Sequence, residues 1–215
     1  MKHNRCKQLF GDDFSKLTAA NIIILGVGGV GGHALDCLYR SGVENITIVD
    51  FDIFDETNQN RQIGSEAVGS TKVEHLKTLY PNITAINKMI DIPWVESFDF
   101  DSYDLILDAI DDIPPKIQLI VKYHKKLIST TGSAKRIDPK CIEYIEIYDT
   151  HSDPFAKSIR KKLKKENFDE SFKVIFSGEE ARTNLMGSFV GVTGSFGLTM
   201  CSIAIEKILD KSIDD

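Results

Sequence analysis

A glycine-rich turn between a buried strand and a helix limits the fold of this chain more than any other feature. The turn spans residues 26–32 and reads Gly-Val-Gly-Gly-Val-Gly-Gly. Apolar, β-branched residues precede it at 21–25, and an apolar helical pattern follows it as far as residues 41–42. In this setting, backbone N–H groups at the helix N-terminus approach a phosphate without obstruction by Cβ atoms. The turn therefore predicts nucleotide binding, and the alternative is that its glycines serve only close helix packing.

Strands alternate with helices along most of the chain. After the first strand and helix, the pattern predicts a strand at 45–50, a charged helix around 66–80, a strand at 104–109, a helix after Pro114 and Pro115, and a strand at 126–130. Residues 141–149 and 173–177 are strand-like again. This alternation predicts an α/β fold, a Rossmann-like doubly wound sheet that is mostly parallel, with the C-terminal strands extending it.

The length of 215 residues suits one domain. We expect an N-terminal arm (1–20), a nucleotide-binding core (21–135) and a C-terminal part (136–215) with the extending strands, a basic helix and a closing helix. Four scattered cysteines form no C-x-x-C pair, which favours reduced thiols in a cytoplasmic protein and gives no zinc site. Residues 185–205 carry no charge and are long enough to span a bilayer. Their glycines favour a helix packed on the sheet over a helix in contact with a membrane.

Polar residues follow the second strand. Asp50 ends that strand, where an acid accepts hydrogen bonds from ribose hydroxyls, and a dinucleotide cofactor would fit this acid and the glycine turn equally well. Arg61 and Lys72 favour ATP, because an enzyme that expels pyrophosphate must stabilise charge on phosphoryl oxygens in the transition state. The residues expected to bind the nucleotide are Gly26, Gly28, Gly29, Gly31, Asp50, Asp52, Asn58 and Gln62.

Carboxylates also close the strand at 104–109. Asp108, Asp111 and Asp112 come at its end, so they are expected at the same edge of the sheet as the phosphates. Mg²⁺ prefers one or two carboxylates together with phosphate oxygens and water. We assign Asp111 as the metal ligand, and the alternative role is a helix cap before Pro114.

The order of these pieces resembles the ubiquitin-activating superfamily of adenylating enzymes, which includes the bacterial activators of sulfur-carrier proteins. The matching motifs are G-x-G-G-x-G at 26–31, D-x-D at 50–52, N-x-x-R-Q at 58–62, V-G-x-x-K at 68–72 and D-A-I-D at 108–111. The resemblance implies that Arg61 and Lys72 bind phosphates and that Asp111 binds Mg²⁺. It also implies a homodimer in which Arg5 reaches the ATP site of the partner.

The C-terminal half resembles one branch of that superfamily, the tRNA threonylcarbamoyladenosine dehydratases. The resemblance rests on Thr-Thr-Gly-Ser-Ala at 130–134, Ile-Asp-Pro at 137–139 and the run at 153–164. It implies that ATP adenylates the threonyl carboxylate of N6-threonylcarbamoyladenosine in tRNA, and that internal attack then closes a ring and releases AMP. A sulfur-relay protein is a further partner compatible with the resemblance.

The run at 153–164 also has a physical interpretation. Ser152 or Asp153 is expected to cap a helix that starts at Pro154 and buries an apolar stripe. Its other face is basic, although the formal net charge of the chain is −6, and this predicts a local tRNA contact. The candidate tRNA-binding residues are Lys157, Arg160, Lys161 and Lys164, and the alternative is a solvated helix face.

Two other functions remain open on the sequence. The first is an adenylyltransferase that activates the C-terminal Gly-Gly of a small sulfur-carrier or ubiquitin-like protein, and the second is a nucleotide-binding or NAD-binding module without catalysis. Thioester or persulfide transfer is disfavoured, because Cys201 falls within an apolar helical pattern and is expected to be buried. His33 begins the first long helix and receives no role.

Overall fold

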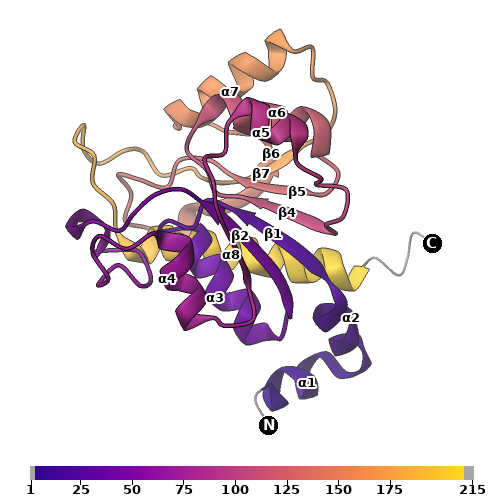
Figure 1. The fold of residues 1–215 in the computed structure, drawn as a ribbon. Helices are drawn as coiled ribbons and strands as arrows, with labels where there is room; N and C mark the ends of the chain where they lie inside the picture. Colours follow the sequence, from indigo (N-terminus) through magenta and orange to yellow (C-terminus); the bar gives the residue numbers. More distant parts are fainter. Residues whose placement is uncertain (1–2, 211–215) are drawn as a thin grey trace.

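The computed structural model describes residues 3–210 and is built around one seven-stranded sheet (Figure 1). Its strands are β1 (Asn21–Leu25), β2 (Asn45–Asp50), β3 (Thr84–Asn87), β4 (Leu105–Asp108), β5 (Leu127–Thr130), β6 (Ile142–Glu146) and β7 (Lys173–Ser177). They lie in the order β3-β2-β1-β4-β5-β7-β6, and every neighbouring pair is parallel except β6 and β7. The Rossmann-like sheet with C-terminal strands that extend it is thus confirmed.

Helices cover both faces of this sheet (Figure 1). The α-helices are α1 (Asn4–Phe10), α2 (Phe14–Ala19), α3 (Gly31–Ser41), α4 (Lys72–Leu79), α5 (Ile92–Ser97), α6 (Ile113–Tyr123), α7 (Pro154–Lys165) and α8 (Val190–Asp210). Short 3₁₀ helices are η1 (Gly11–Asp13), η2 (Glu56–Asn58), η3 (Pro139–Cys141) and η4 (Ile147–Asp149). The first two residues of the expected N-terminal arm and the last five of the expected C-terminal part lie outside the described residues.

Alternation along the strands divides the apolar core in two. In β1, Ile22 and Ile24 face a core shared with α3, α4 and α8, whereas Ile23 and Leu25 face a core shared with α5, α6 and α7. Successive side chains of a strand point to opposite faces, so an unbroken apolar strand is the form that a doubly covered sheet requires. The apolar run at 21–25 therefore predicted the strand, and the structure adds its central place in the sheet.

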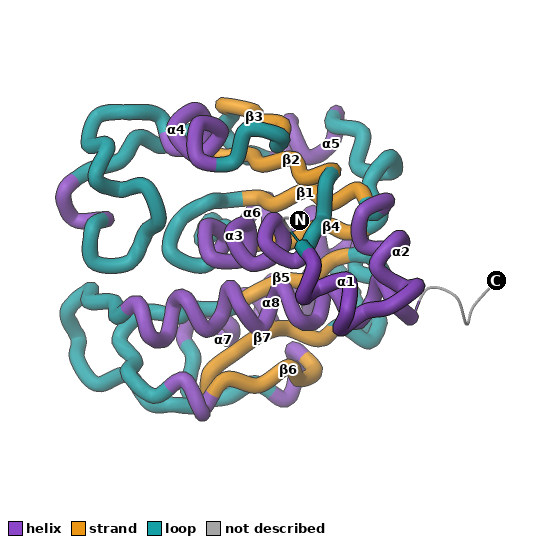
Figure 2. The backbone as a smooth tube through the Cα atoms, turned by 90° about the horizontal axis from the view of Figure 1, so that it is seen from below, coloured by secondary structure: helices purple, strands orange, loops and turns teal. Residues whose placement is uncertain are grey.

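The carboxyl ends of the six parallel strands meet at one end of the sheet, where long loops gather (Figure 2, teal, on the left). The chain leaves β1 toward α3 on one face and leaves β4 toward α6 on the other face. Since β1 and β4 are neighbours, their connections diverge and leave a crevice above the sheet. Ligands of doubly wound folds bind at such a switch point.

The uncharged segment near the C-terminus forms α8, which begins at Val190 and packs on α3 and the sheet. Gly197 makes this close approach possible, because a Cβ atom there would lie 2.3 Å from the carbonyl oxygen of Val30 and 2.9 Å from the amide nitrogen of Ala34. Among the described helices, α8 alone is long and apolar enough to cross a bilayer, and ten of its 21 residues are buried inside the protein. The packed-helix interpretation of 185–205 agrees with this placement.

Two expectations about the elements need correction, and four short elements were not predicted. The charged helix expected around 66–80 begins only at Lys72, because residues 66–71 form a turn in which Gly69 has a φ of +86° and its N–H donates to Phe54. The strand expected over 141–149 stops at Glu146, where η4 begins. The elements β3, α5, α1 and α2 were not predicted individually, since they are short and partly exposed.

Candidate active site

A large cleft of about 1530 Å³ opens at the carboxyl ends of β1, β2, β4 and β5. The glycine turn, the loop after β2, the residues after β4, the loop after β5, the start of α7 and the loop before α8 all line it. Pockets for one small molecule range from roughly 300 to 1,000 Å³. The cleft therefore has room for a nucleotide and a second substrate.

The glycine turn forms one wall of the cleft. A Cβ atom on Gly31 would lie only 1.9 Å from the carbonyl oxygen of Gly26, so this tight turn requires glycine at position 31. Within the described part of the chain, no acceptor takes the backbone N–H groups of Gly28, Gly29 and Val30. These donors precede the first turn of α3, so the turn has the geometry of a phosphate cradle.

Asp50 holds that turn in place. Its Oδ2 accepts the Val27 N–H at 2.8 Å and its Oδ1 accepts the Asp52 N–H at 2.9 Å, and the side chain is buried at the cleft wall. A carboxylate has about four acceptor positions, so two remain for ribose hydroxyls. The structure thus adds a turn-stabilising role to the expected ribose contact.

The two expected phosphate-binding cations both line the cleft. The Arg61 side chain packs against Gly29, and its Nη1 donates to the Thr57 carbonyl oxygen and to Asn60 Oδ1, both at 2.9 Å. Lys72 starts α4 and is almost fully buried, with its Nζ 2.8 Å from Asp52 Oδ2. Asp52 therefore pairs with Lys72.

Asn58 and Gln62 also lie in the cleft wall, and both are buried. Asn58 Oδ1 accepts the Asp55 N–H at 3.3 Å, which makes it part of the capping box that orders η2. Gln62 lies beside Gly28, and its Oε1 is buried with no hydrogen-bond partner among the described residues. A buried carbonyl oxygen without a partner at the wall of a cleft marks a contact point for a ligand donor.

Asp111 is exposed to the cleft between the phosphate turn and the loop after β5. The N-cap residue of α6 is Asp112 rather than Asp111, and the Asp112 side chain makes no capping hydrogen bond. No group of three or more His, Cys, Asp or Glu side chains able to hold a metal occurs in the described ranges. Asp111 therefore fits a Mg²⁺ ion of the kind found in nucleotide sites, where one or two carboxylates bind the ion and phosphate oxygens and water supply the remaining ligands.

A fully buried ion pair lies under this carboxylate. Lys116 Nζ is 2.7 Å from Asp108 Oδ2, and neither side chain is exposed. Burial lowers the pKa of Lys116, while the charges of Asp108 and Asp111 act to raise it. Asp108 was predicted at the sheet edge but Lys116 was not, although the spacing of Lys116 from Leu119 and Ile120 puts it on the apolar face of α6.

The loop after β5 forms a second half of the cleft, and before the structure only its motif at 130–134 pointed to it. Arg136 is buried there, donates through Nη1 to the Gly132 carbonyl oxygen, and lies 4.0 Å from Asp153 Oδ2. Asp153 in turn accepts the N–H groups of Gly132 and of Phe155. Thr131 Oγ1 is buried without a partner among residues 3–210. These polar groups face the nucleotide half across the cleft.

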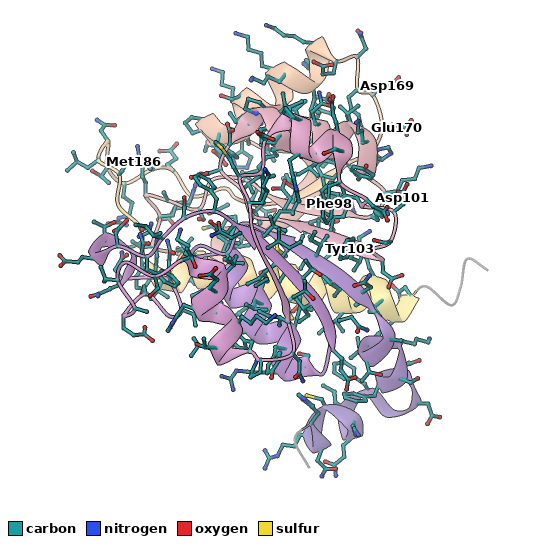
Figure 3. The ribbon with its side chains drawn as sticks, in the orientation of Figure 1. Phe98, Asp101, Tyr103, Asp169, Glu170 and Met186 are labelled. Atoms are coloured by element: carbon teal, nitrogen blue, oxygen red, sulfur yellow. The ribbon has the colours of Figure 1, made fainter. Side chains whose placement is uncertain are left out.

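The loop before α8 borders the cleft from the outside, with residues 181–188 along its margin. It carries two strongly exposed apolar side chains, Leu185 and Met186, of which Met186 is labelled in Figure 3. The Lys135 N–H donates to the Gly187 carbonyl oxygen at 2.8 Å, which ties this loop to the loop after β5. Nothing in the sequence pattern indicated this contact.

The start of α7 reaches the cleft, whereas its basic face points outward. Asp153 caps the helix, Pro154 is its first residue, and Ala156, Ile159 and Leu163 are buried, as expected. Lys157, Lys161 and Lys164 are exposed. Arg160 is partly buried and donates to the carbonyl and hydroxyl oxygens of Thr150, so part of its guanidinium already has acceptors.

Three further residues of the sequence analysis lie elsewhere. Arg5 is exposed on α1, which Figure 1 shows at the amino end of β1, away from the cleft loops. His33 Nδ1 lies 2.9 Å from the Gly29 carbonyl oxygen, at the back of the phosphate turn. Cys201 is fully buried in the core with α3, as expected.

Comparisons with known proteins agree with this geometry. The model of the ThiF family matches residues 3–213. A tRNA threonylcarbamoyladenosine dehydratase of Bacillus subtilis is 38% identical over 76% of this chain and 68% of its own, and one of Escherichia coli is 32% identical over 73% and 63%. The chain thus spans about two thirds of these relatives.

A solved structure covers more of the chain. The E. coli tRNA N6-threonylcarbamoyladenosine dehydratase in complex with ATP superposes with a TM-score of 0.91 and 29% identity, over 98% of this chain and 95% of that chain. The same E. coli protein in complex with AMP gives a TM-score of 0.91. Both ATP and AMP have therefore been seen bound to that relative.

Proposed function

Because this chain belongs to the ThiF family, we propose that it is an ATP-dependent dehydratase that acts on N6-threonylcarbamoyladenosine in tRNA. The observation that carries the proposal is the two-part cleft. One half has free N–H donors, two cations and a carboxylate for a nucleotide, and the other half is polar and lies beside the start of the basic helix α7. The dehydratases named above give the class of substrate.

The reaction has two steps in this proposal. A threonyl carboxylate oxygen attacks the α-phosphorus of ATP, the bond to pyrophosphate breaks, and an acyl-adenylate forms. The carbamoyl group then attacks the activated carbonyl carbon, the ring closes, and AMP leaves with the carboxylate oxygen while a proton is released. The nucleoside thereby loses the elements of one water molecule.

The side chains at the cleft have separate tasks. The free N–H groups of the glycine turn and the guanidinium of Arg61 bind phosphate oxygens, and Lys72 neutralises the charge that grows as pyrophosphate leaves. Asp50 positions the ribose, and Asp52 keeps Lys72 in its buried place. Preorganised donors of this kind need no rearrangement at the moment of reaction.

We further propose that Asp111 holds Mg²⁺ together with phosphate oxygens. The ion would neutralise phosphate charge and orient the α-phosphate for attack. The exposed position of Asp111 in the cleft supports this assignment, because a carboxylate there faces the phosphate turn.

A homodimer in the cytoplasm completes the proposal. Arg5 lies away from its own cleft, so a contribution of this residue to an ATP site requires the partner subunit. The exposed Lys157, Lys161 and Lys164 would contact tRNA phosphates outside the cleft. A sulfur-relay partner stays a prediction of the resemblance alone.

One experiment tests the function against its alternatives. The protein is incubated with ATP, Mg²⁺ and tRNA that carries or lacks threonylcarbamoyladenosine, and both AMP and the mass of the modified nucleoside are measured. We expect AMP in step with the loss of one water from the nucleoside, only with the modified tRNA. AMP formation or pyrophosphate exchange driven by a Gly-Gly carrier protein, without a change in the nucleoside, would support the adenylyltransferase instead. Nucleotide binding without AMP from either substrate would support a binding module.

A further inference from the structure

Lys116 is a fully buried charge to which the proposed reaction assigns no task. Its side chain is 0% exposed in the interior of α6. Lysine is almost never fully buried unless it is paired, and replacing a buried ion pair by apolar residues often leaves stability unchanged or increases it. A gain in stability is therefore a poor explanation for the presence of this buried ion pair, whereas the geometry of its hydrogen bonds offers another.

The Lys116 ammonium has three donors and meets three acceptors. Its Nζ lies 2.7 Å from Asp108 Oδ2, 3.2 Å from Ser129 Oγ and 3.1 Å from the Thr130 carbonyl oxygen. Ser129 Oγ also donates to Asp108 Oδ2 at 2.6 Å. This match between donors and acceptors is what the charged form of lysine provides and what no neutral side chain of similar length reproduces.

The acceptors lie at the carboxyl ends of two adjacent strands. Asp108 is the last residue of β4, and Ser129 and Thr130 are the last residues of β5. The residues that follow these strands lead directly to Asp111 and Thr131 in the cleft. Lys116 thus joins the two strand ends directly below the point where the chain enters the cleft.

The network also acts on Asp111 itself. Asp108 Oδ1 accepts the Ile110 N–H at 3.2 Å, so the backbone that leads to Asp111 is attached to the buried pair. Lys116 and Asp111 are close enough to interact electrostatically. With Lys116 absent, the Asp108 charge would lack its partner and would repel both Asp111 and the phosphates.

We propose that Lys116 is a positioning residue that fixes the end of β4 against the end of β5, so that Asp111 is held at the distance from the phosphate turn that Mg²⁺-dependent binding of ATP requires. The inference rests on the proposed use of ATP and Mg²⁺. It does not depend on tRNA, because nucleotide binding can be measured without it.

The test is a double-mutant cycle read by calorimetric titration with ATP. Wild type, Lys116→Met, Asp111→Asn and the double variant are each titrated with ATP in Mg²⁺ and with ATP in a chelator. We expect Lys116→Met to reduce the Mg²⁺-dependent gain in ATP affinity roughly tenfold, which is the size of a typical coupling within one network. In the double variant, Lys116→Met should cause no loss of ATP affinity beyond that caused by Asp111→Asn alone. The affinity measured in chelator should change little.

The matched control is Lys122→Met, which removes an exposed lysine from the same helix and should leave both affinities unchanged. If Lys116→Met does not fold, Asp108→Asn combined with Lys116→Met removes both charges and takes its place in the cycle. A full Mg²⁺-dependent gain in the Lys116 variant, or losses that multiply with those of Asp111→Asn, would overturn the inference. A wild-type protein without any Mg²⁺-dependent gain would instead contradict the proposed function.

Discussion

Arg61 and Lys72 line the same cleft but extend into it from different elements. Arg61 extends from the loop after β2 across Gly29, and Lys72 projects from the first turn of α4 with Asp52 at its Nζ. Both positions were predicted from the sequence, because a cation after the phosphate turn is expected to bind phosphate. Their hydrogen-bond partners were not predictable, since these depend on how the loop at 51–71 folds back on itself.

We expect Arg61→Ala and Lys72→Ala each to reduce kcat by about a hundredfold to a thousandfold, because each removes a preorganised positive charge from the developing phosphoryl charge. The measurement is AMP release with modified tRNA, together with thermal unfolding to show that each variant is folded. Lys77→Ala is the matched control for Lys72, since Lys77 is an exposed lysine of the same helix. Wild-type turnover in either site variant would remove that residue from the mechanism.

Buried polar residues limited what sequence could say about the site. Lys116, Arg136 and Thr131 are buried around the cleft. Lys116 contacts the ends of β4 and β5, Arg136 Nε donates to the carbonyl oxygen of the distant Glu179, and Thr131 Oγ1 has no partner among the described residues. Only Lys116 left a detectable signal, a cation on the apolar face of a helix. Arg136 follows the Thr-Thr-Gly-Ser-Ala motif and has no pattern that separates it from a surface arginine.

Among the elements, those with strong apolar patterns were predicted closely. Strands β1 and β2 have the expected bounds, and α3 ends at Ser41 with Gly42 in the left-handed conformation. In contrast, β3 has four residues, and none of them is fully buried. A four-residue strand at the edge of the sheet carries too few apolar positions for a period to be recognised. Pairing with β2 decides its conformation.

The contact between α3 and α8 links the long C-terminal helix to the phosphate turn. We expect Gly197→Ala to destabilise the protein by about 1 to 3 kcal/mol, because the added methyl group meets the backbone of Val30 and Ala34 and forces the two helices apart. Urea unfolding measures the change. Gly187→Ala is the control, since no atom lies within 4 Å of a Cβ atom there. Equal free energies of unfolding for the two variants would show that α3 and α8 accommodate the added methyl group without a loss of stability.

The basic face of α7 makes a separate prediction about tRNA. Lys161→Ala should lower tRNA affinity and reduce the slope of log affinity against log salt by about one, as expected for one lost phosphate contact. Filter binding over a range of salt concentrations measures both quantities. Lys77→Ala removes the same charge on the other face of the sheet and should leave the slope unchanged. An unaltered slope for Lys161→Ala would indicate that this part of α7 is only a solvated face.

At the scale of the whole molecule, the position of α1 bears on the assembly. Arg5 cannot serve the cleft of its own chain from the amino end of β1, so its expected role requires a dimer. We expect Arg5→Ala and Lys72→Ala each to be nearly inactive. An equal mixture of the two variants should regain activity at about a quarter of its sites, because about half of the dimers are mixed and each mixed dimer has one intact site of two. Activity of the mixture after subunit exchange is the measurement. A mixture no more active than its parts would argue against an active site shared between subunits.

The proposed reaction depends on adenylation of a carboxylate. The most direct measurement uses tRNA in which both carboxylate oxygens of the threonylcarbamoyl group are labelled with ¹⁸O, followed by mass spectrometry of AMP and of the nucleoside. Attack on the α-phosphorus predicts that one labelled oxygen appears in AMP for every ring closed and that the other stays in the ring carbonyl. Formation of ADP with the label in free inorganic phosphate, as attack on the γ-phosphorus would give, or formation of AMP without label while the nucleoside loses water, would contradict adenylation of the carboxylate.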